Sequence, residues 1–102
     1  MQTERYQSFE AFWPFYLKEH SLPLNRRLHF VGTTLALSCL VLALVQMQPL
    51  FLLGAPLCGY GWAWFGHFMI EKNRPATFQY PLWSLRGDFR MYGQMLRGQL
   101  WG

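Results

Sequence analysis

Two long stretches without a charged side chain constrain the fold of this chain more than any other feature. Residues 28–47 read LHFVGTTLALSCLVLALVQM, and residues 50–70 read LFLLGAPLCGYGWAWFGHFMI. A helix of about 20 residues is long enough to cross the hydrocarbon core of a bilayer, which is about 30 Å thick. Only Gln48 and Pro49 separate the two stretches. The sequence therefore predicts a transmembrane helical hairpin with two spans and a tight turn.

The composition agrees with a membrane protein. Only 14% of the residues are charged and 52% are hydrophobic, whereas soluble domains contain about 25% charged residues. The two cysteines, Cys39 and Cys58, lie inside the apolar stretches and lack the CxxC spacing of a zinc or redox site. We interpret them as small apolar side chains.

Each end of the chain adds an amphipathic pattern. Apolar side chains recur at steps of three and four in residues 6–19 and again in residues 82–101. The first seam consists of Phe9, Phe12, Trp13 and Tyr16, and the second of Leu82, Leu85, Phe89, Tyr92, Leu96 and Leu100. We expect the first helix to lie in the membrane interface, and the last to lie on the membrane or against the hairpin. The predicted fold is a single all-α membrane domain over residues 1–102, in which two amphipathic helices flank the hairpin.

The positive charges lie at one end of the predicted hairpin. Arg26 and Arg27 precede the first span, Lys72 and Arg74 follow the second, and the turn between the spans carries none. The positive-inside rule then places both termini on the cytoplasmic side. Topology and anionic lipid headgroups explain the net charge of +4, so we expect membrane lipids, and not nucleic acid, as partners.

All three histidines of the chain are expected at that same end. In an antiparallel hairpin with its turn at Gln48 and Pro49, His29 lies level with His67. His20 stands in the connector just before the first span. Glu71 follows His67 by four residues, so an α-helix that continues this far places the two on one face.

Imidazole and carboxylate ligands suit a mid-row transition metal. The hypothesis is that His20, His29, His67 and Glu71 bind Fe(II), with zinc as an alternative because it accepts the same ligands. Glu71 is either a fourth ligand or a partner that orients an imidazole. The spacing alone leaves open a structural role for these residues without any metal.

Other polar residues near this site have more than one interpretation. Lys72 and Arg74 suit the carboxylate of a fatty acid or an anionic headgroup, although topology alone also explains them. Asn25 is expected to bind substrate together with Lys72 and Arg74, and also to cap or brace the connector. Asp88 is expected to cap a helix, or otherwise to add a spare carboxylate to the site.

Small residues recur at four-residue steps in the second apolar stretch, at Ala55, Gly59 and Ala63. Such a ridge allows a neighbouring helix to approach closely. The neighbour is either the other helix of the hairpin or a second copy of the chain, so a homo-oligomer stays open.

Two segments of the chain resemble a known family. FYLKEHSLPLNRRLHFVGT and GHFMIEKNRPATF are similar to the small membrane family typified by the fungal 2-hydroxy fatty acid dioxygenase, which also has bacterial members. The positions that match the family pattern are Tyr16, His20, Pro23, Asn25, His29, Gly66, His67, Glu71, Lys72, Arg74 and Pro75. The fungal members are longer and carry further hydrophobic segments between the two blocks, where this chain has a short turn.

The resemblance implies an Fe(II)-dependent enzyme of fatty acid α-oxidation in a bacterial cytoplasmic membrane. Such an enzyme uses O₂ to remove one carbon from a 2-hydroxy fatty acid, and the histidines are the iron ligands. Because the chain is short, the walls around the acyl chain are expected from lipid or from a second subunit. The alternatives are a non-catalytic membrane hairpin and a zinc-dependent lipid hydrolase with Glu71 as general base.

Overall fold

The computed structural model describes residues 5–102, and this part of the chain is helical with no strand. The elements are α1 (Phe9–Lys18), α2 (Pro23–Val45), α3 (Phe51–Phe65), the π-helix η1 (Gly66–Glu71), the 3-10 helix η2 (Ala76–Phe78) and α4 (Pro81–Leu96). The predicted all-α class is therefore confirmed. Residues 1–4 of the predicted domain lie outside the described residues.

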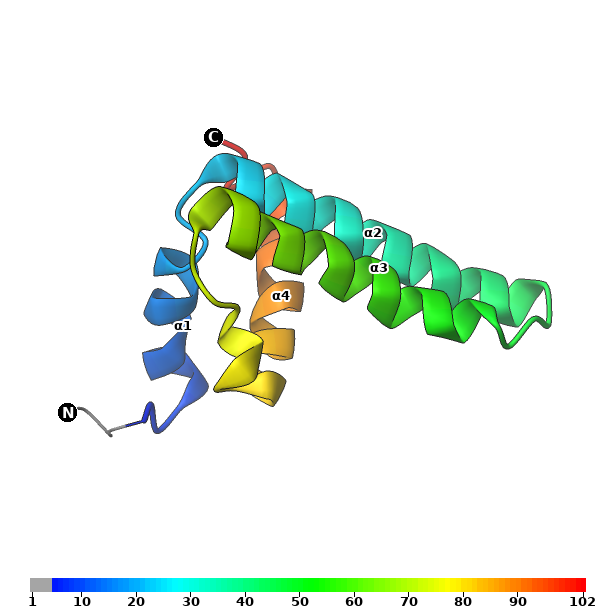
Figure 1. The fold of residues 1–102 in the computed structure, drawn as a ribbon, viewed down its shortest axis with the longest axis horizontal. Coiled ribbons are helices and arrows are strands. Elements are labelled where there is room, and N and C mark those ends of the chain that lie inside the picture. The colour runs from blue at the N-terminus through cyan, green and yellow to red at the C-terminus, as the bar shows by residue number, and fades with distance from the viewer. Residues whose placement is uncertain (1–4) are drawn as a thin grey trace.

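Helices α2 and α3 form a long antiparallel pair that projects from the rest of the molecule (Figure 1). The turn between them contains Gln48 and Pro49, as predicted. The predicted start of the first hairpin helix was wrong, because α2 begins at Pro23 and not at residue 28. Proline suits the first helical position, since its φ is already helical and no amide hydrogen is left unpaired there.

The two predicted spans differ in the structure. Within the described residues, α2 is the one helix that is both long and apolar enough to cross a membrane. Helix α3 has 15 residues and ends at Phe65, where the chain continues as η1. The second predicted span, residues 50–70, is thus an α-helix followed by a π-helix, and the two-span arrangement stays a prediction.

Small residues allow α2 and α3 to pack closely. A Cβ atom on Gly32 would lie 2.9 Å from Cβ of Trp62 and 3.0 Å from the carbonyl oxygen of Cys58. A Cβ atom on Gly59 would meet Cβ of Ala36 at 3.6 Å. At Gly59, the predicted ridge of small residues therefore packs inside the hairpin.

The ends of the chain form a base at the end of the hairpin away from its turn (Figure 1). The predicted aromatic seam of α1 is present, and its side chains are the buried residues Phe9, Phe12, Trp13 and Tyr16. They pack in one core with Met91 and Met95 of α4. The expectation that these rings lie among lipid headgroups was wrong, because α4 covers them.

The predicted seam of α4 is not its packing face. Leu82, Leu85, Phe89 and Leu96 are exposed, and the buried residues are Ser84, Gly87, Met91 and Met95. Gly87 explains this orientation, because a Cβ atom there would lie 2.9 Å from the ring of Tyr16. The helix also ends at Leu96, so the predicted extension to residue 101 was wrong.

Candidate metal centre

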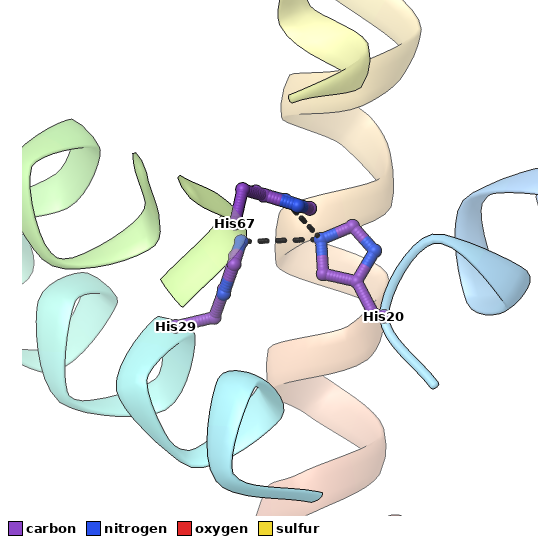
Figure 2. Close-up of side chains that lie close together, drawn as sticks. All are labelled: His20, His29 and His67. Carbon is purple, nitrogen blue, oxygen red and sulfur yellow. Dashed lines mark hydrogen bonds between the residues drawn. The ribbon is translucent and has the colours of Figure 1, made fainter. Parts of the chain in front are cut away.

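Three histidines from three different elements meet where the hairpin joins the base (Figure 2). His20 lies in the connector after α1, His29 on α2 and His67 in η1. Their exposed fractions are 1%, 5% and 2%. One ligand nitrogen from each lies within 4.8 Å of the others. The histidines therefore converge, as the hairpin geometry predicted.

The hydrogen-bond partners of the rings determine where each imidazole carries its proton. Nδ1 of His20 lies 2.6 Å from the carbonyl oxygen of Tyr16, and Nδ1 of His29 lies 2.9 Å from that of Asn25. A carbonyl oxygen only accepts, so both Nδ1 atoms donate. A neutral imidazole carries one N–H, which leaves a lone pair on each Nε2.

His67 follows the same pattern through a side chain. Its Nδ1 lies 2.7 Å from Oδ1 of Asn73. Nδ2 of Asn73 donates to the carbonyl oxygen of Glu19 at 3.1 Å, and this bond orients the amide so that its oxygen faces His67. His67 therefore also donates from Nδ1 and presents the lone pair of Nε2.

The three Nε2 atoms face one another across a small space (Figure 2). Nε2 of His20 lies 3.1 Å from Nε2 of His29 and 3.0 Å from Nε2 of His67. Lone pairs at this distance repel, and no N–H remains to join them. A metal ion between them would accept all three lone pairs, because metal–nitrogen bonds are about 2.0–2.1 Å long. Ligating histidines in proteins also donate their other N–H to an oxygen, as these do.

The electrostatic environment keeps His20 neutral. Burial lowers the pKa of His20 well below its ordinary value, and the neighbouring His29 and His67 lower it further. A neutral imidazole is the form that binds a metal ion. The residues present therefore fit a bound transition metal.

Glu71 points toward the connector. Its carboxylate accepts hydrogen bonds from the backbone N–H of Leu22 at 2.6 Å and from the hydroxyl of Ser21 at 3.2 Å. The group of possible metal ligands in the described residues contains the three histidines and not Glu71. The predicted four-residue step assumed an α-helix, whereas His67 and Glu71 lie in a π-helix, whose wider turn changes their relative direction.

Asn25 is a buried residue that contacts both His29 and Glu71. Its side chain is fully buried, and its Nδ2 donates to Glu71 at 3.4 Å. Its Oδ1 has no hydrogen-bond partner within the described part of the chain. Gly66 packs directly over this oxygen, because a Cβ atom on Gly66 would overlap with Oδ1. Asn25 thus holds His29 through its main chain and Glu71 through its side chain.

Asn73 was missed in the sequence analysis. It reaches His67 because Lys72 ends η1 in the left-handed conformation, with φ 63° and ψ 40°. The backbone N–H of Asn73 then donates to the carbonyl oxygen of His67 at 3.0 Å. An asparagine shortly after a histidine and a helix end was the available signal, but the turn depends on a strained residue that the sequence does not reveal.

Lys72 and Arg74 lie away from the three imidazoles. Both are exposed. The guanidinium carbon of Arg74 lies over the ring of Phe78, 5.2 Å from its centroid. Arg74 lines a cavity of about 290 Å³ beside Glu19 and Gln79, into which none of the histidines faces.

A mainly apolar groove of about 260 Å³ runs along the hairpin and reaches His29. Its walls come from α2, α3 and α4, and include Ala36, Leu37, Leu40, Pro56, Ala63 and Phe89. Asp88 lines the same groove. The expectation that Asp88 caps a helix was wrong, because it lies in the middle of α4 and accepts a hydrogen bond from the hydroxyl of Tyr16.

Comparison with curated proteins and with solved structures finds no match. A family model does match, over residues 6–100, and its description is 2-hydroxy-palmitic acid dioxygenase Mpo1-like. The matched range contains all three histidines and both segments that carry the resemblance. The resemblance is thereby confirmed, and the chain belongs to the Mpo1-like family.

Proposed function

We propose that this chain is a non-haem iron dioxygenase that removes one carbon from a 2-hydroxy fatty acid. In this reaction one O₂ is consumed, and the acid shortened by one carbon, CO₂ and water are formed. The observation that carries the proposal is the convergence of three buried imidazoles, to whose Nε2 lone pairs no described residue donates. The family description names a 2-hydroxy acid as the substrate of the family.

His20, His29 and His67 would hold the iron. Bound Fe(II) with open positions supplies the activation of O₂ that non-haem oxygenases use. The protein's part is to keep the three Nε2 atoms deprotonated and oriented. The carbonyl oxygens of Tyr16 and Asn25 and the side-chain oxygen of Asn73 do this by accepting hydrogen bonds from the Nδ1–H groups.

Glu71 acts in this proposal through the connector and not on the metal directly. Its bonds to Leu22 and Ser21 tie η1 to the segment that carries His20. The carbonyl oxygen of His20 also accepts from Nη1 of Arg26 at 2.7 Å. These bonds restrict the position of the one ligand that no helix carries.

The groove is the proposed site of the acyl chain. It is lined mainly by apolar side chains and reaches His29. From His29 to Leu40 an α-helix rises by about 16 Å, so a long alkyl chain can lie along the hairpin with its carboxyl end near the imidazoles. Burying such a chain contributes about 0.8 kcal/mol per methylene group.

We propose that the hairpin is embedded in the bacterial cytoplasmic membrane with two spans and both termini on the cytoplasmic side. Large apolar side chains are exposed along the hairpin and near its turn, among them Val41, Leu44, Val45, Leu53 and Leu57. Soluble monomers rarely expose so large an apolar surface. Lipid, or a second copy of the chain, would cover it and complete the groove.

Lys72 and Arg74 are proposed to attract the substrate's carboxylate at the membrane surface. Neither residue lines the groove, so their action would precede binding at the imidazoles. Their charge also fits the cytoplasmic end of a span.

Zinc is the second candidate metal, because three imidazoles with an open position are also a catalytic zinc set. A zinc hydrolase would need Glu71 as general base. The bonds of that carboxylate to the connector favour the oxygenase instead.

The proposal is tested by incubating the purified protein with Fe(II), O₂ and 2-hydroxypalmitic acid. Mass spectrometry should detect the acid shortened by one carbon, and the His67→Ala variant should form none. Zinc-dependent release of a hydrolysed lipid, or equal product from His67→Ala, would contradict it.

A further inference from the structure

One carboxylate lies in the otherwise mainly apolar groove. Among the described residues that line the groove, Asp88 carries the only carboxylate. The neighbouring lining residues of α4, Leu85 and Phe89, are apolar. A carboxyl group in such surroundings costs free energy unless it is hydrogen-bonded.

The fold holds Asp88 in place through Tyr16. The Tyr16 hydroxyl donates to Oδ1 of Asp88, and the Tyr16 ring is fully buried. Gly87 makes this contact possible, because any side chain there would collide with the Tyr16 ring. The ring of Tyr16 also stacks on His20, with 4.0 Å between the ring centroids. Asp88 is thus fixed relative to the three imidazoles.

This arrangement leaves Asp88 with unused capacity to accept a hydrogen bond. Tyr16 provides its one hydrogen bond within the described residues, and that bond uses Oδ1. Burial raises the pKa of Asp88 to about 7, although the hydrogen bond from Tyr16 lowers it. Within the described residues, the second oxygen, Oδ2, accepts no hydrogen bond.

The chemistry of the groove restricts what can pair with Oδ2. An alkyl chain offers no donor, and the carboxylate of a fatty acid would repel the ionised form of Asp88. A hydroxyl group is a neutral donor that matches it. A 2-hydroxy acid carries such a group beside its carboxyl end, which is the end proposed to lie near His29.

We propose that Asp88 recognises the 2-hydroxyl group of the substrate by accepting its hydrogen bond, and that Tyr16 is the positioning residue for Asp88. This inference rests on the proposed function, since it assumes a 2-hydroxy fatty acid in the groove. A fatty acid without the hydroxyl leaves Asp88 unpaired, and a site built to bond a hydroxyl rejects the analogue that lacks it.

The experiment compares two ligands, 2-hydroxypalmitic acid and palmitic acid. Their dissociation constants are measured with the Fe(II)-loaded protein in the absence of O₂, so that no turnover occurs. The parent should prefer the hydroxy acid. Asp88→Leu should reduce this preference about 10- to 100-fold, as expected for a hydrogen bond to a charged group.

Two further variants separate recognition from folding. Tyr16→Phe keeps the stacked ring and should lower the preference by a smaller factor, because Asp88 remains but is no longer held. Asp88→Asn has nearly the shape of the parent side chain and should also lose part of the preference. Glu10→Gln removes an exposed carboxylate of α1 and should leave the preference unchanged.

The outcomes separate this inference from the proposed function. The inference would be overturned if the parent bound both acids with the same affinity. It would also be overturned if the Asp88 variants kept the parent's preference for the hydroxy acid, or if they lost affinity for both acids equally. If the parent converts 2-hydroxypalmitic acid while the Asp88 variants keep the preference, the inference fails and the proposed function stands. If Asp88 governs the preference but no product forms, the inference stands and the dioxygenase proposal fails.

Discussion

Gly66 is the position where one added methyl group should disturb the site most. It is buried at the start of η1, and a Cβ atom there would overlap with Oδ1 of Asn25 and lie 3.0 Å from Cγ of that residue. Ordinary contacts between carbon atoms are about 3.5–4.0 Å. Asn25 is fully buried, so its side chain can avoid the added methyl group only by displacing neighbouring atoms.

The change in the free energy of unfolding caused by Gly66→Ala follows from two opposing effects. Forcing an extra methyl group into a packed site costs about 1–3 kcal/mol, while replacing a helical glycine by alanine recovers up to about 1 kcal/mol. The two effects together leave a range of about 0–3 kcal/mol, and we expect a net loss in the free energy of unfolding near its middle, about 1–2 kcal/mol. For a domain of this size, each kcal/mol lowers Tm by about 4–8 °C. Metal affinity should fall as well, because the carbonyl oxygen of Asn25 orients His29.

Thermal unfolding in detergent, followed by circular dichroism, measures this loss. Gly61→Ala and Gly93→Ala are matched controls, since a Cβ atom at either position would meet nothing within 4 Å. Both controls should unfold at the parent's temperature or above it. If Gly66→Ala unfolds with the controls and binds metal like the parent, the account of Asn25 and Gly66 is refuted.

Three further predictions concern the residues around the imidazoles. Asn73→Ala removes the acceptor for Nδ1 of His67, so metal affinity, measured by competition with a chelator, should fall about 10- to 100-fold; unchanged affinity would contradict the role of Asn73. Glu71→Gln should weaken affinity over a similar range without abolishing metal binding, whereas a complete loss would make Glu71 a ligand. Asp88 has a pKa of about 7 in the folded protein against an ordinary 3.8, so between these pH values the folded state binds more protons than the unfolded state. The contribution of Asp88 to stability is therefore full below about pH 4 and is lost as the pH rises through 7. Denaturant titrations across pH 4–8 should show this fall in the parent and a flatter profile in Asp88→Asn; parallel profiles would refute it.

The general architecture could be predicted because it depends on local patterns. The two uncharged stretches and the turn at Gln48 and Pro49 determine the register of the hairpin, and that register brings His29 level with His67. The aromatic spacing of residues 6–19 likewise identified the buried face of α1. These features need only helical periodicity and chain length.

The remaining details depend on tertiary packing. The Glu71 side chain points in another direction than predicted because η1 is a π-helix. Asn73 reaches His67 only because Lys72 adopts a left-handed conformation. The packing face of α4 was not the most apolar one, since the close approach of Tyr16 to Gly87 determines its orientation. Helical periodicity does not predict these contacts, and two of them lie at the proposed site.

Metal binding by His20, His29 and His67 can be measured by elemental analysis of the purified protein after loading with Fe(II). The parent should contain about one iron per chain, because each Nε2 supplies a bond that alanine cannot replace. His20→Ala, His29→Ala and His67→Ala should each retain almost none, while Glu10→Gln should match the parent. A folded parent without metal, or histidine variants that retain as much iron as the parent, would contradict the claim.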